Sequence, residues 1–341
     1  MAGRSRTRPT MVDVAESAGV SLKTVSRVVN GVSTVDQDLA ERVRQAAVQL
    51  GFRPNRMAAD LKSGAATAMI GLVTKDISNE FYAAITQGTA EVAAQRGVQL
   101  ITAGTSGEDI EEETEISTIF ELCRRRVDGL IIVPRGKDQS VLAREMEMGT
   151  PMVFVDQAPH GMAADSIVLD NERGTALAID DLIERGHRRI GLVCDSLDID
   201  SIHQRYLGHR GQLRHYDLPV EDELFYTGVH GPDETAKAVG ALLDGPRPPT
   251  AIFCGNNRAT IGTVREVWRR RADVTIAGFD DFTISDLMPV PLTLVSFDAT
   301  ELGRRAAQML FDRIDGDDGP AKSITLPVRL RQSGIPSSRR V

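Results

Sequence analysis

The fold of this 341-residue chain is limited most by an alternation that begins near Met69. Short, nearly continuous apolar runs rich in β-branched residues alternate from there with longer amphipathic segments. Runs of this kind suit the strands of a parallel sheet, which helices cover on both faces. We expect strands at 69–73, 98–103, 129–133, 152–155, 166–169, 189–193, 251–254 and 274–279.

The amphipathic segments between these runs predict helices at 80–96, 110–124, 172–185, 201–215, 233–244 and 257–270. Two successive sets of strands and helices predict two doubly wound lobes. In sheets of this type a ligand binds beyond the carboxyl ends of the strands. The length agrees with this fold, because roughly 150 residues per domain gives about two domains with room for a small third unit.

The first 64 residues have a wholly helical pattern instead, with helices expected up to Gly19, from Ser21 to about Asn30, and over about 36–50. Gly19 suits the left-handed position after a helix, and Ser21 is a good N-cap. Two short helices joined by a turn, with a third that closes the core, predict a helix-turn-helix unit. Its core would contain Val12, Ala15, Ala18, Val25, Val28 or Val29, Leu39, Val43, Ala46, Ala47 and Leu50.

Charge is divided unevenly between these two regions. The whole chain has a formal net charge of −8 at pH 7. Residues 1–64 carry ten Lys and Arg against six Asp and Glu, a balance of +4, whereas residues 65–341 carry 30 against 42, a balance of −12. The basic N-terminal region is therefore the candidate for contact with a polyanion.

The second expected helix has a polar outward face. In a helix-turn-helix unit this helix enters the major groove of DNA. An Arg there can donate two hydrogen bonds to guanine, and Leu22 can contact a thymine methyl. The face would present Leu22, Lys23, Ser26, Arg27 and Asn30. From the residues alone, a solvated polar face on a small helical subdomain is an equal alternative.

A family resemblance favours the DNA-binding interpretation. The segment VDVAESAGVSLKTVSRVVNG at 12–31 resembles the DNA-binding signature of the LacI–GalR family of bacterial transcription regulators, and GFRPNRMAADLKSG at 51–64 resembles its hinge. The resemblance implies that the second helix reads bases, with Leu22, Lys23 and Arg27 at the specificity positions. The candidate DNA contacts are Ser21, Leu22, Lys23, Thr24, Ser26, Arg27, Asn30, Asn55, Ala58 and Leu61.

The hinge predicts an element that folds on binding. Pro54 ends the third helix, and Asn55 can cap a short helix over 56–62. An isolated helix of this length is marginal in water, so we expect it to order only when two copies pack together on DNA. The resemblance implies that Leu61 wedges between base pairs from the minor groove and bends the duplex.

The rest of the chain resembles the periplasmic-binding-protein-like core of the same family, with matching segments at 71–88, 127–134, 168–193, 278–282 and 291–310. The resemblance implies that a small polar effector binds between the lobes. The residues that match the family's pocket are Asp76, Asn79, Phe81, Tyr82, Asp156, Arg205, Asn257 and Asp281. From the residues alone, Asp76, Asn79 and Asp281 can instead cap helices, and Phe81 or Tyr82 can belong to the core.

One pocket position departs from the family pattern. In FCGNNRATIG at 253–262, Asn257 stands where the family usually has the Asp of an Asn-Asp pair. A carboxylate only accepts hydrogen bonds, whereas an amide both accepts and donates them. The departure puts a typical neutral sugar in doubt and leaves room for a phosphorylated or otherwise anionic effector.

Motifs of other function classes are absent from the sequence. It contains no G-x-S-x-G elbow, no G-x-x-x-x-G-K-[ST] phosphate loop, no H-E-x-x-H and no G-x-G-x-x-G, and its six His have no metal spacing. We therefore expect no enzyme activity, no cofactor and no metal. No apolar run reaches the ~18 residues of a membrane span, and the N-terminus has no apolar core of a signal peptide. Three widely separated Cys favour a reducing cytoplasm over an exported binding protein.

These features predict an all-α helix-turn-helix domain at 1–53, a hinge at 54–64, and a two-lobed α/β domain at 65–341 that binds the effector and dimerises. We expect a homodimeric transcriptional repressor that binds a pseudo-palindromic operator in double-stranded DNA. A sugar, a sugar phosphate or a related metabolite would control its affinity. An activator or a co-repressor-dependent regulator is the alternative, followed by a sugar-binding protein or an enzyme with the same body fold.

Overall fold

A computed structural model of the protein describes residues 9–29, 34–52, 68–104 and 112–334. Two compact units are present, Met1–Thr67 and Ala68–Val341, which we call the head and the body. The expected hinge helix at 56–62, with Asn55, Ala58 and Leu61, lies outside the described residues, and so does Asn30.

The head contains the three expected helices, α1 (Met11–Ala18), α2 (Leu22–Val29) and α3 (Gln37–Leu50). α1 begins with a capping box, in which the Thr10 hydroxyl accepts from the Asp13 amide and the Asp13 carboxylate accepts from the Thr10 amide at 2.6 Å. It ends at Gly19, whose φ of 63° is the left-handed conformation expected there. The helix-turn-helix prediction is confirmed.

A small apolar core joins the three helices of the head. It contains Val14, Ala15, Ala18, Val25, Val43 and Ala46, with Val20, Val28, Val29, Ala47 and Phe52 packed against it. Two predicted core residues are wrong, since Val12 is 51% exposed and Leu50, the last residue of α3, is 37% exposed. Val14 is buried in place of Val12. It precedes the buried Ala18 by four residues, which places the two about 40° apart around the helix, whereas Val12 precedes Ala15 by three residues and lies about 60° from it.

The body contains two six-stranded sheets with the strand orders β11-β5-β4-β3-β1-β2 and β12-β10-β9-β8-β6-β7. Neighbouring strands are parallel throughout, except that β12 is antiparallel to β10. Lobe 1 contains β1 (Met69–Thr74), β2 (Gln99–Gly104), β3 (Gly129–Ile132), β4 (Met152–Val155), β5 (Asp165–Leu169) and β11 (Ser323–Leu326). Lobe 2 contains β6 (Ile190–Val193), β7 (Phe225–Tyr226), β8 (Ala251–Cys254), β9 (Thr275–Phe279), β10 (Leu292–Ser296) and β12 (Arg329–Ser333).

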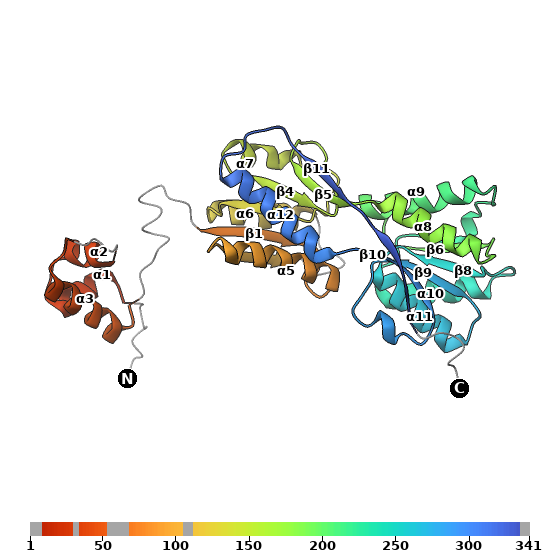
Figure 1. The fold of residues 1–341 in the computed structure, drawn as a ribbon, viewed down its shortest axis with the longest axis horizontal. Coiled ribbons are helices and arrows are strands. Elements are labelled where there is room, and N and C mark those ends of the chain that lie inside the picture. The colour runs from red at the N-terminus through yellow and green to blue at the C-terminus, as the bar shows by residue number, and fades with distance from the viewer. Residues whose placement is uncertain (1–8, 30–33, 53–67, 105–111, 335–341) are drawn as a thin grey trace. The chain divides into compact units, whose positions relative to one another are not determined.

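Helices flank both sheets (Figure 1). Lobe 1 has α5 (Glu80–Gln95), α6 (Glu112–Arg124), α7 (Ala143–Glu147) and α12 (Ala299–Ile314). Lobe 2 has α8 (Asn171–Glu184), α9 (Asp200–His215), α10 (Gly231–Asp244) and α11 (Asn257–Arg270). Single turns of 3-10 helix occur at Ser140–Leu142, Asp222–Leu224 and Ser285–Leu287. The doubly wound α/β class predicted for the body is therefore confirmed, and the eight expected strands and six expected helices all form within two residues of their predicted ends.

The lobes are not the successive stretches of chain that we expected. After β10 the chain returns to lobe 1, where α12 packs against α5 and β4 and where β11 pairs with β5 (Figure 1). It then enters lobe 2 again as β12. Over residues 112–334 the chain thus crosses between the lobes three times, since it first crosses between β5 and α8. Apolar periodicity identifies a strand but not the sheet that it joins, which is the reason for the error.

Two glycines let α12 lie directly against α5. A Cβ atom at Gly88 would lie 2.0 Å from the Thr300 carbonyl oxygen, and one at Gly303 would lie 2.0 Å from the Ile85 carbonyl oxygen. Only glycine at both positions permits this backbone approach. The returning helix is therefore fixed against the helix whose first turn borders the space between the lobes.

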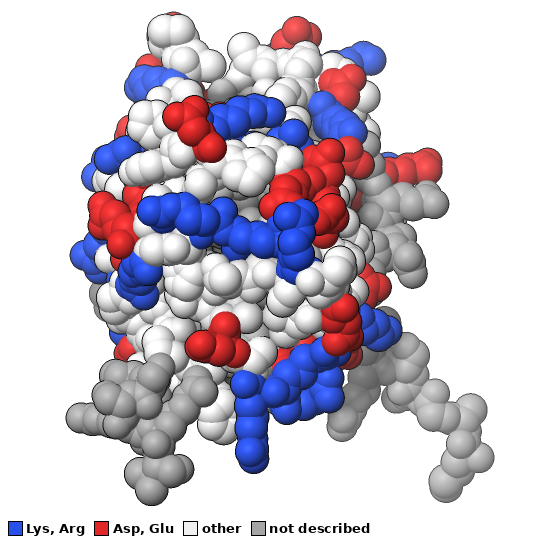
Figure 2. Space-filling view, turned by 90° about the vertical axis from the view of Figure 1, so that its right-hand side faces the viewer, with Lys and Arg blue, Asp and Glu red and all other residues white. Residues whose placement is uncertain are grey.

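Acidic and basic side chains are mixed on the face of the molecule in Figure 2. Ion pairs of lobe 2 contribute to such a mixture, for example Arg270 with Asp244 at 2.6 Å and Arg265 with Asp233 at 2.7 Å. The acidic surplus of the body is thus not gathered into a single-sign field on this face. None of the helices in the described part of the chain is long and apolar enough to cross a membrane.

Candidate functional site

A cavity of about 610 Å³ lies between the two lobes of the body. Its polar lining residues come mainly from the segments that follow the carboxyl ends of parallel strands, as expected for doubly wound sheets. These residues are Lys75 and Asp76 after β1, Arg135 after β3, Asp156 after β4, Asp195 after β6, Asn256 and Arg258 after β8, and Asp280 after β9. The topology therefore brings charged groups of both signs into one space.

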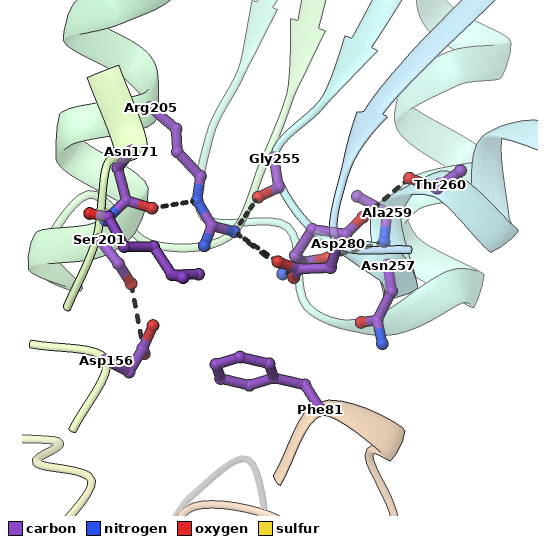
Figure 3. A network of polar contacts seen from close by, with 12 residues as sticks. Phe81, Asp156, Asn171, Ser201, Arg205, Gly255, Asn257, Ala259, Thr260 and Asp280 are labelled. Carbon is purple, nitrogen blue, oxygen red and sulfur yellow. Dashed lines mark hydrogen bonds and ion pairs between the residues drawn. The ribbon is translucent and has the colours of Figure 1, made fainter. Parts of the chain in front are cut away.

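Arg205 on α9 is held on several sides (Figure 3). Its side chain is 3% exposed. Its Nε donates to Asn171 Oδ1 and its Nη1 to the Gly255 carbonyl, both at 2.8 Å, and the Asp280 carboxylate lies 3.4 Å from Nη1. The guanidinium also lies 3.6 Å from the centroid of the Phe279 ring, within the range of a cation–π contact. Arg205 is thus a rigid cation in the cavity wall.

Two buried carboxylates line the same cavity, Asp156 from lobe 1 and Asp280 from lobe 2. The Ser201 hydroxyl donates to Asp156 at 3.4 Å. Burial raises the pKa of Asp280, and the charge of Arg205 opposes that rise. Both aspartates have left-handed backbone conformations, with φ of 72° and 70°. Such strain in residues other than glycine is concentrated at binding and catalytic sites.

Side chains at the start of α5 contact lobe 2 beside the cavity. Asn79 caps α5 by accepting from the Phe81 amide at 3.1 Å, and its Oδ1 also accepts from Asn257 Nδ2 at 2.9 Å. Arg258 forms an ion pair with Asp76 and donates to the Ser78 hydroxyl at 3.1 Å. These contacts tie the two lobes together in the present arrangement.

The aromatic wall of the cavity comes from α5. Phe81 packs edge-to-face against Tyr82 and against Phe297, with ring centroids 5.0 and 5.8 Å apart. In Figure 3 the Phe81 ring points into the space between Asp156 and Asp280. Burial raises the pKa of Tyr82 well above its usual value, and the charges of Asp156 and Asp280 add to this rise. The cavity thus combines an apolar ring face with opposed charges, a combination suited to a small polar ligand.

In the head, α2 turns its polar side chains outward. Leu22, Lys23 and Arg27 are exposed, whereas Val25 is fully buried in the core. The Ser21 hydroxyl accepts from the Thr24 amide at 3.1 Å and so caps the helix as expected. Thr24 and Ser26 are half-buried. The exposed side chains suit a helix that contacts base edges in a major groove.

Comparisons with known proteins match both units. Residues 10–55 match the model of bacterial regulatory proteins of the lacI family, and residues 179–333 match that of the periplasmic binding protein-like domain. The probable HTH-type transcriptional regulator EndR of Paenibacillus polymyxa is 28% identical over 329 residues, which cover 94% of this chain and 95% of EndR. The HTH-type transcriptional repressor CytR of Escherichia coli K12 is 28% identical over 319 residues, 92% of each chain.

A solved structure extends the match to the whole architecture. The crystal structure of the lac repressor dimer bound to operator and the anti-inducer ONPF is 27% identical, has a TM-score of 0.80, and covers 96% of this chain and 99% of its own. The chain belongs to the lacI family of bacterial regulatory proteins. This lacI-family protein is accordingly a DNA-binding transcription regulator and not an enzyme.

The cavity of this lacI-family protein contains most of the predicted effector residues. Asp76, Asn79, Phe81, Tyr82, Asp156 and Arg205 all line it. Asn79 serves both of the roles that its sequence position allowed, as helix cap and as lining residue. Asn257 is buried beside the cavity, where it contacts Asn79, while its neighbours Asn256 and Arg258 provide the lining.

The prediction of Asp281 is corrected to Asp280. Asp281 borders a different hollow, where it forms an ion pair with Arg331 at 2.7 Å and accepts from the Ser285 hydroxyl at 2.8 Å. Asp280 has a left-handed backbone conformation directly after β9, so the chain turns there, and the side chains of Asp280 and Asp281 enter different hollows. The match to the family motif GFDDF did not determine which of the two aspartates points inward.

Sequence reasoning missed several lining residues, among them Lys75, Arg135, Asp195, Asn256, Arg258 and Asp280. A simple signal could have found most of them, because Lys75, Asp195, Asn256 and Asp280 lie within two residues of a strand's carboxyl end. His230 and Ser201 carried no such signal, since both lie at the starts of helices. Asn30, Asn55, Ala58 and Leu61 cannot be placed in this way, as they fall outside the described residues.

Proposed function

We propose that this lacI-family protein is a cytoplasmic, homodimeric repressor whose affinity for a pseudo-palindromic operator is controlled by a small effector in the cavity between the lobes. The observation that carries the proposal is the shared lining of that cavity. Asp156 and Tyr82 belong to lobe 1, whereas Arg205 and Asp280 belong to lobe 2. A ligand that contacts both walls favours one arrangement of the lobes by its difference in affinity for the alternatives.

The proposed effector contacts are the six predicted residues that line the cavity together with Asp280. A ligand hydroxyl can donate to Asp156 or Asp280, and an acceptor can bind Arg205. The contact of Asn257 with Asn79 links the same wall to α5, so a movement of the lobes changes this helix end. Effector binding and operator binding would then be coupled through the lobe arrangement and the paired hinge residues Asn55, Ala58 and Leu61.

The proposed DNA contacts in the head are Ser21, Leu22, Lys23, Thr24, Ser26, Arg27 and Asn30. Two heads in a homodimer would read two half-sites related by a two-fold axis. The related lac repressor was crystallised as a dimer bound to operator, and the related CytR is named a repressor. Both names support a repressor over an activator for this chain.

Selection from a randomised duplex library with the full-length protein tests the DNA function. We expect enrichment of a pseudo-palindrome, with affinity that falls steeply with salt because phosphate contacts release counterions. Arg27→Ala should weaken binding to the selected site about 5- to 150-fold, corresponding to one lost base contact of about 1–3 kcal/mol. Fluorescence anisotropy at fixed ionic strength measures this loss.

The matched control is Arg44→Ala, which removes one exposed positive charge from α3 of the same head. A loss with Arg44→Ala as large as that with Arg27→Ala would mean that the head binds DNA by charge alone. A ligand that lowers operator affinity would be an inducer, and one that raises it would be a co-repressor. A chain that selects no sequence at all would contradict the proposed function.

A further inference from the structure

One basic group of the cavity has no hydrogen-bond partner among the described residues. Lys75 follows β1 directly, lines the cavity and is only 7% exposed. Its Nζ is fully buried and has no hydrogen-bond partner among the residues that the structure describes. Lysine is almost never buried in this way without a partner, because an ammonium group taken out of water needs hydrogen bonds and a counter-charge.

The other basic side chains of the cavity have contacts within the protein. Arg205 is held by Asn171, Gly255 and Asp280, Arg258 pairs with Asp76, and His230 Nδ1 lies 2.7 Å from the Asp195 carboxylate. Arg135 donates to the backbone carbonyl of Lys75. Among the described lining residues, Lys75 is therefore the basic residue whose side-chain nitrogen makes no hydrogen bond. An anionic ligand can bind it without displacing an existing partner.

The charges around Lys75 have both signs. Burial lowers the pKa of Lys75, the charges of Asp156, Glu115 and Asp195 oppose this fall, and that of Arg135 adds to it. The nearby Glu115 carboxylate is already used, since it accepts from the Arg135 amide at 2.9 and 3.2 Å. A ligand carboxylate against Nζ would supply both the missing acceptor and a charge that favours the protonated lysine.

Two carboxylates of the cavity, one from each lobe, need hydrogen-bond donors. Asp280 Oδ1 is buried and accepts no hydrogen bond from the described residues, and Asp156 accepts a long one from Ser201. Ligand hydroxyl groups would satisfy these carboxylate oxygens. Phe81, which points between the two aspartates in Figure 3, would contact the carbon face of the same molecule.

We propose that the effector is a polyhydroxylated carboxylic acid of the sugar-acid class, whose carboxylate accepts from Lys75 Nζ and whose hydroxyls donate to Asp156 and Asp280. This inference rests on the proposed function, because it assumes that the cavity between the lobes is the effector site. A phosphate fits less well. It carries about 1.5 to 2 negative charges at neutral pH, and its second charge would face Asp76, Asp156, Asp195 and Asp280 across the cavity.

The test compares sugar acids with their neutral and phosphorylated relatives. Full-length protein is titrated by calorimetry with gluconate, galactonate, glucuronate and galacturonate, each beside its neutral parent sugar and that sugar's 6-phosphate. We expect at least one sugar acid to bind at least 30-fold more tightly than its parent and its phosphate. The inference is overturned if no sugar acid binds, or if a neutral sugar or a sugar phosphate binds as tightly.

Variants tie the preference to one residue. Lys75→Met keeps the length of the side chain and should weaken sugar-acid binding at least 30-fold, whereas Lys237→Met on the exposed face of α10 should leave it unchanged. Without ligand, Lys75→Met should melt at a higher temperature than the wild-type protein, because it removes an unpaired buried ammonium group. Undiminished binding by a folded Lys75→Met variant would refute the assignment.

Operator binding separates this inference from the proposed function. If a neutral sugar or a nucleoside binds and changes operator affinity, the proposed function holds and the sugar-acid assignment fails. If a sugar acid binds with the expected dependence on Lys75 but operator affinity stays the same, the assignment holds and the proposed control of DNA binding fails.

Discussion

In lobe 2 a basic side chain of the cavity wall is held by its neighbours, whereas in lobe 1 a basic side chain lines the cavity without a hydrogen bond to the described chain. Arg205 contacts Asn171, Gly255 and Asp280 within lobe 2. Lys75 in lobe 1 has a buried Nζ with no hydrogen-bond partner in the described chain. One cavity therefore has a basic group that is already fixed without ligand in one wall and a basic group without a hydrogen bond to the described residues in the other.

The two walls would contribute to binding in different ways. Groups already fixed by neighbours lose little conformational freedom when a ligand arrives, so the lobe 2 wall provides pre-organised contacts. An unpaired buried group instead discriminates among ligands, because only a ligand with the complementary group relieves its desolvation. On this comparison, lobe 2 positions the effector and lobe 1 selects its charge.

Replacement of Arg205 would remove the fixed basic group of lobe 2 and should have the largest effect. Arg205→Met retains much of the side-chain volume but leaves the buried Asp280 carboxylate without its cation. Removal of one partner of a buried ion pair costs about 3–5 kcal/mol. We expect the free energy of unfolding to fall by about this amount and effector binding to be lost, as measured by urea denaturation and by titration calorimetry.

Two further variants control for this prediction. Arg214→Met removes an exposed arginine from the last turn of the same helix and should change neither quantity. The double variant Arg205→Met with Asp280→Asn removes both charges and should recover part of the stability but none of the binding. Wild-type stability of Arg205→Met alone would be incompatible with the contacts in Figure 3.

The core of lobe 2 contains a buried histidine, which should make the stability of the protein depend on pH. His209 on α9 is fully buried, with ring centroids 5.3 Å from Phe225 and 6.1 Å from Phe253. Burial lowers the pKa of His209 to about 3, against about 6.5 in an unfolded chain. The folded state therefore binds fewer protons, and the stability from neutral His209 is complete above pH 6.5 and is lost as the pH falls from there toward 3.

The size of this effect follows from proton linkage. Between pH 8 and pH 5.5 the protonation of His209 in the unfolded chain should lower the free energy of unfolding by about 1.4 kcal/mol. His209→Leu should remove this part of the pH dependence, whereas His215→Leu, at the exposed end of the same helix, should retain it. Denaturation curves at both pH values compare the slopes, and equal slopes for wild type and His209→Leu would contradict the prediction.

The sequence was sufficient to predict the features of the two lobes and the head that depend on local residue patterns. Apolar runs located the strands, and the ends of those strands located the cavity, because parallel strands deliver their following residues to one edge. Arg205 and Asp156 were found through the family resemblance, and both line the cavity. The capping role of Ser21 and the left-handed Gly19 follow from residue type alone.

The unpaired state of Lys75 could not be predicted in the same way. It depends on which groups β3, β4 and β6 bring near β1, and those strands lie between about 50 and 120 residues further along the chain. The same limit applies to α12 and β11, whose return to lobe 1 is decided by packing against α5 and β5. The exchange of Asp281 for Asp280 depended on the left-handed turn of the backbone at Asp280, which the residue types alone do not determine.

The smallest expected effect concerns the contact that joins the two walls. Asn257→Asp would restore the carboxylate that the family usually has, but would lose the donor that Asn79 Oδ1 accepts at 2.9 Å. Asn79 cannot turn its amide to compensate, because the same oxygen caps α5 by accepting from the Phe81 amide, so only the longer 3.4 Å donation from Asn79 Nδ2 to the oxygen of residue 257 would remain. One hydrogen bond contributes about 0.5–1.5 kcal/mol, so we expect effector affinity to fall between about twofold and tenfold by titration calorimetry.

A double-mutant cycle shows whether this loss passes through Asn79. Asn79→Ser keeps a side-chain oxygen that can cap α5 but is too short to reach Asn257. In that background the partner of Asn257 is already gone, so Asn257→Asp should weaken effector binding no further. Equal losses of effector affinity in both backgrounds would instead mean that residue 257 acts on the ligand directly and not through Asn79. The two lobes would then contribute to effector binding independently.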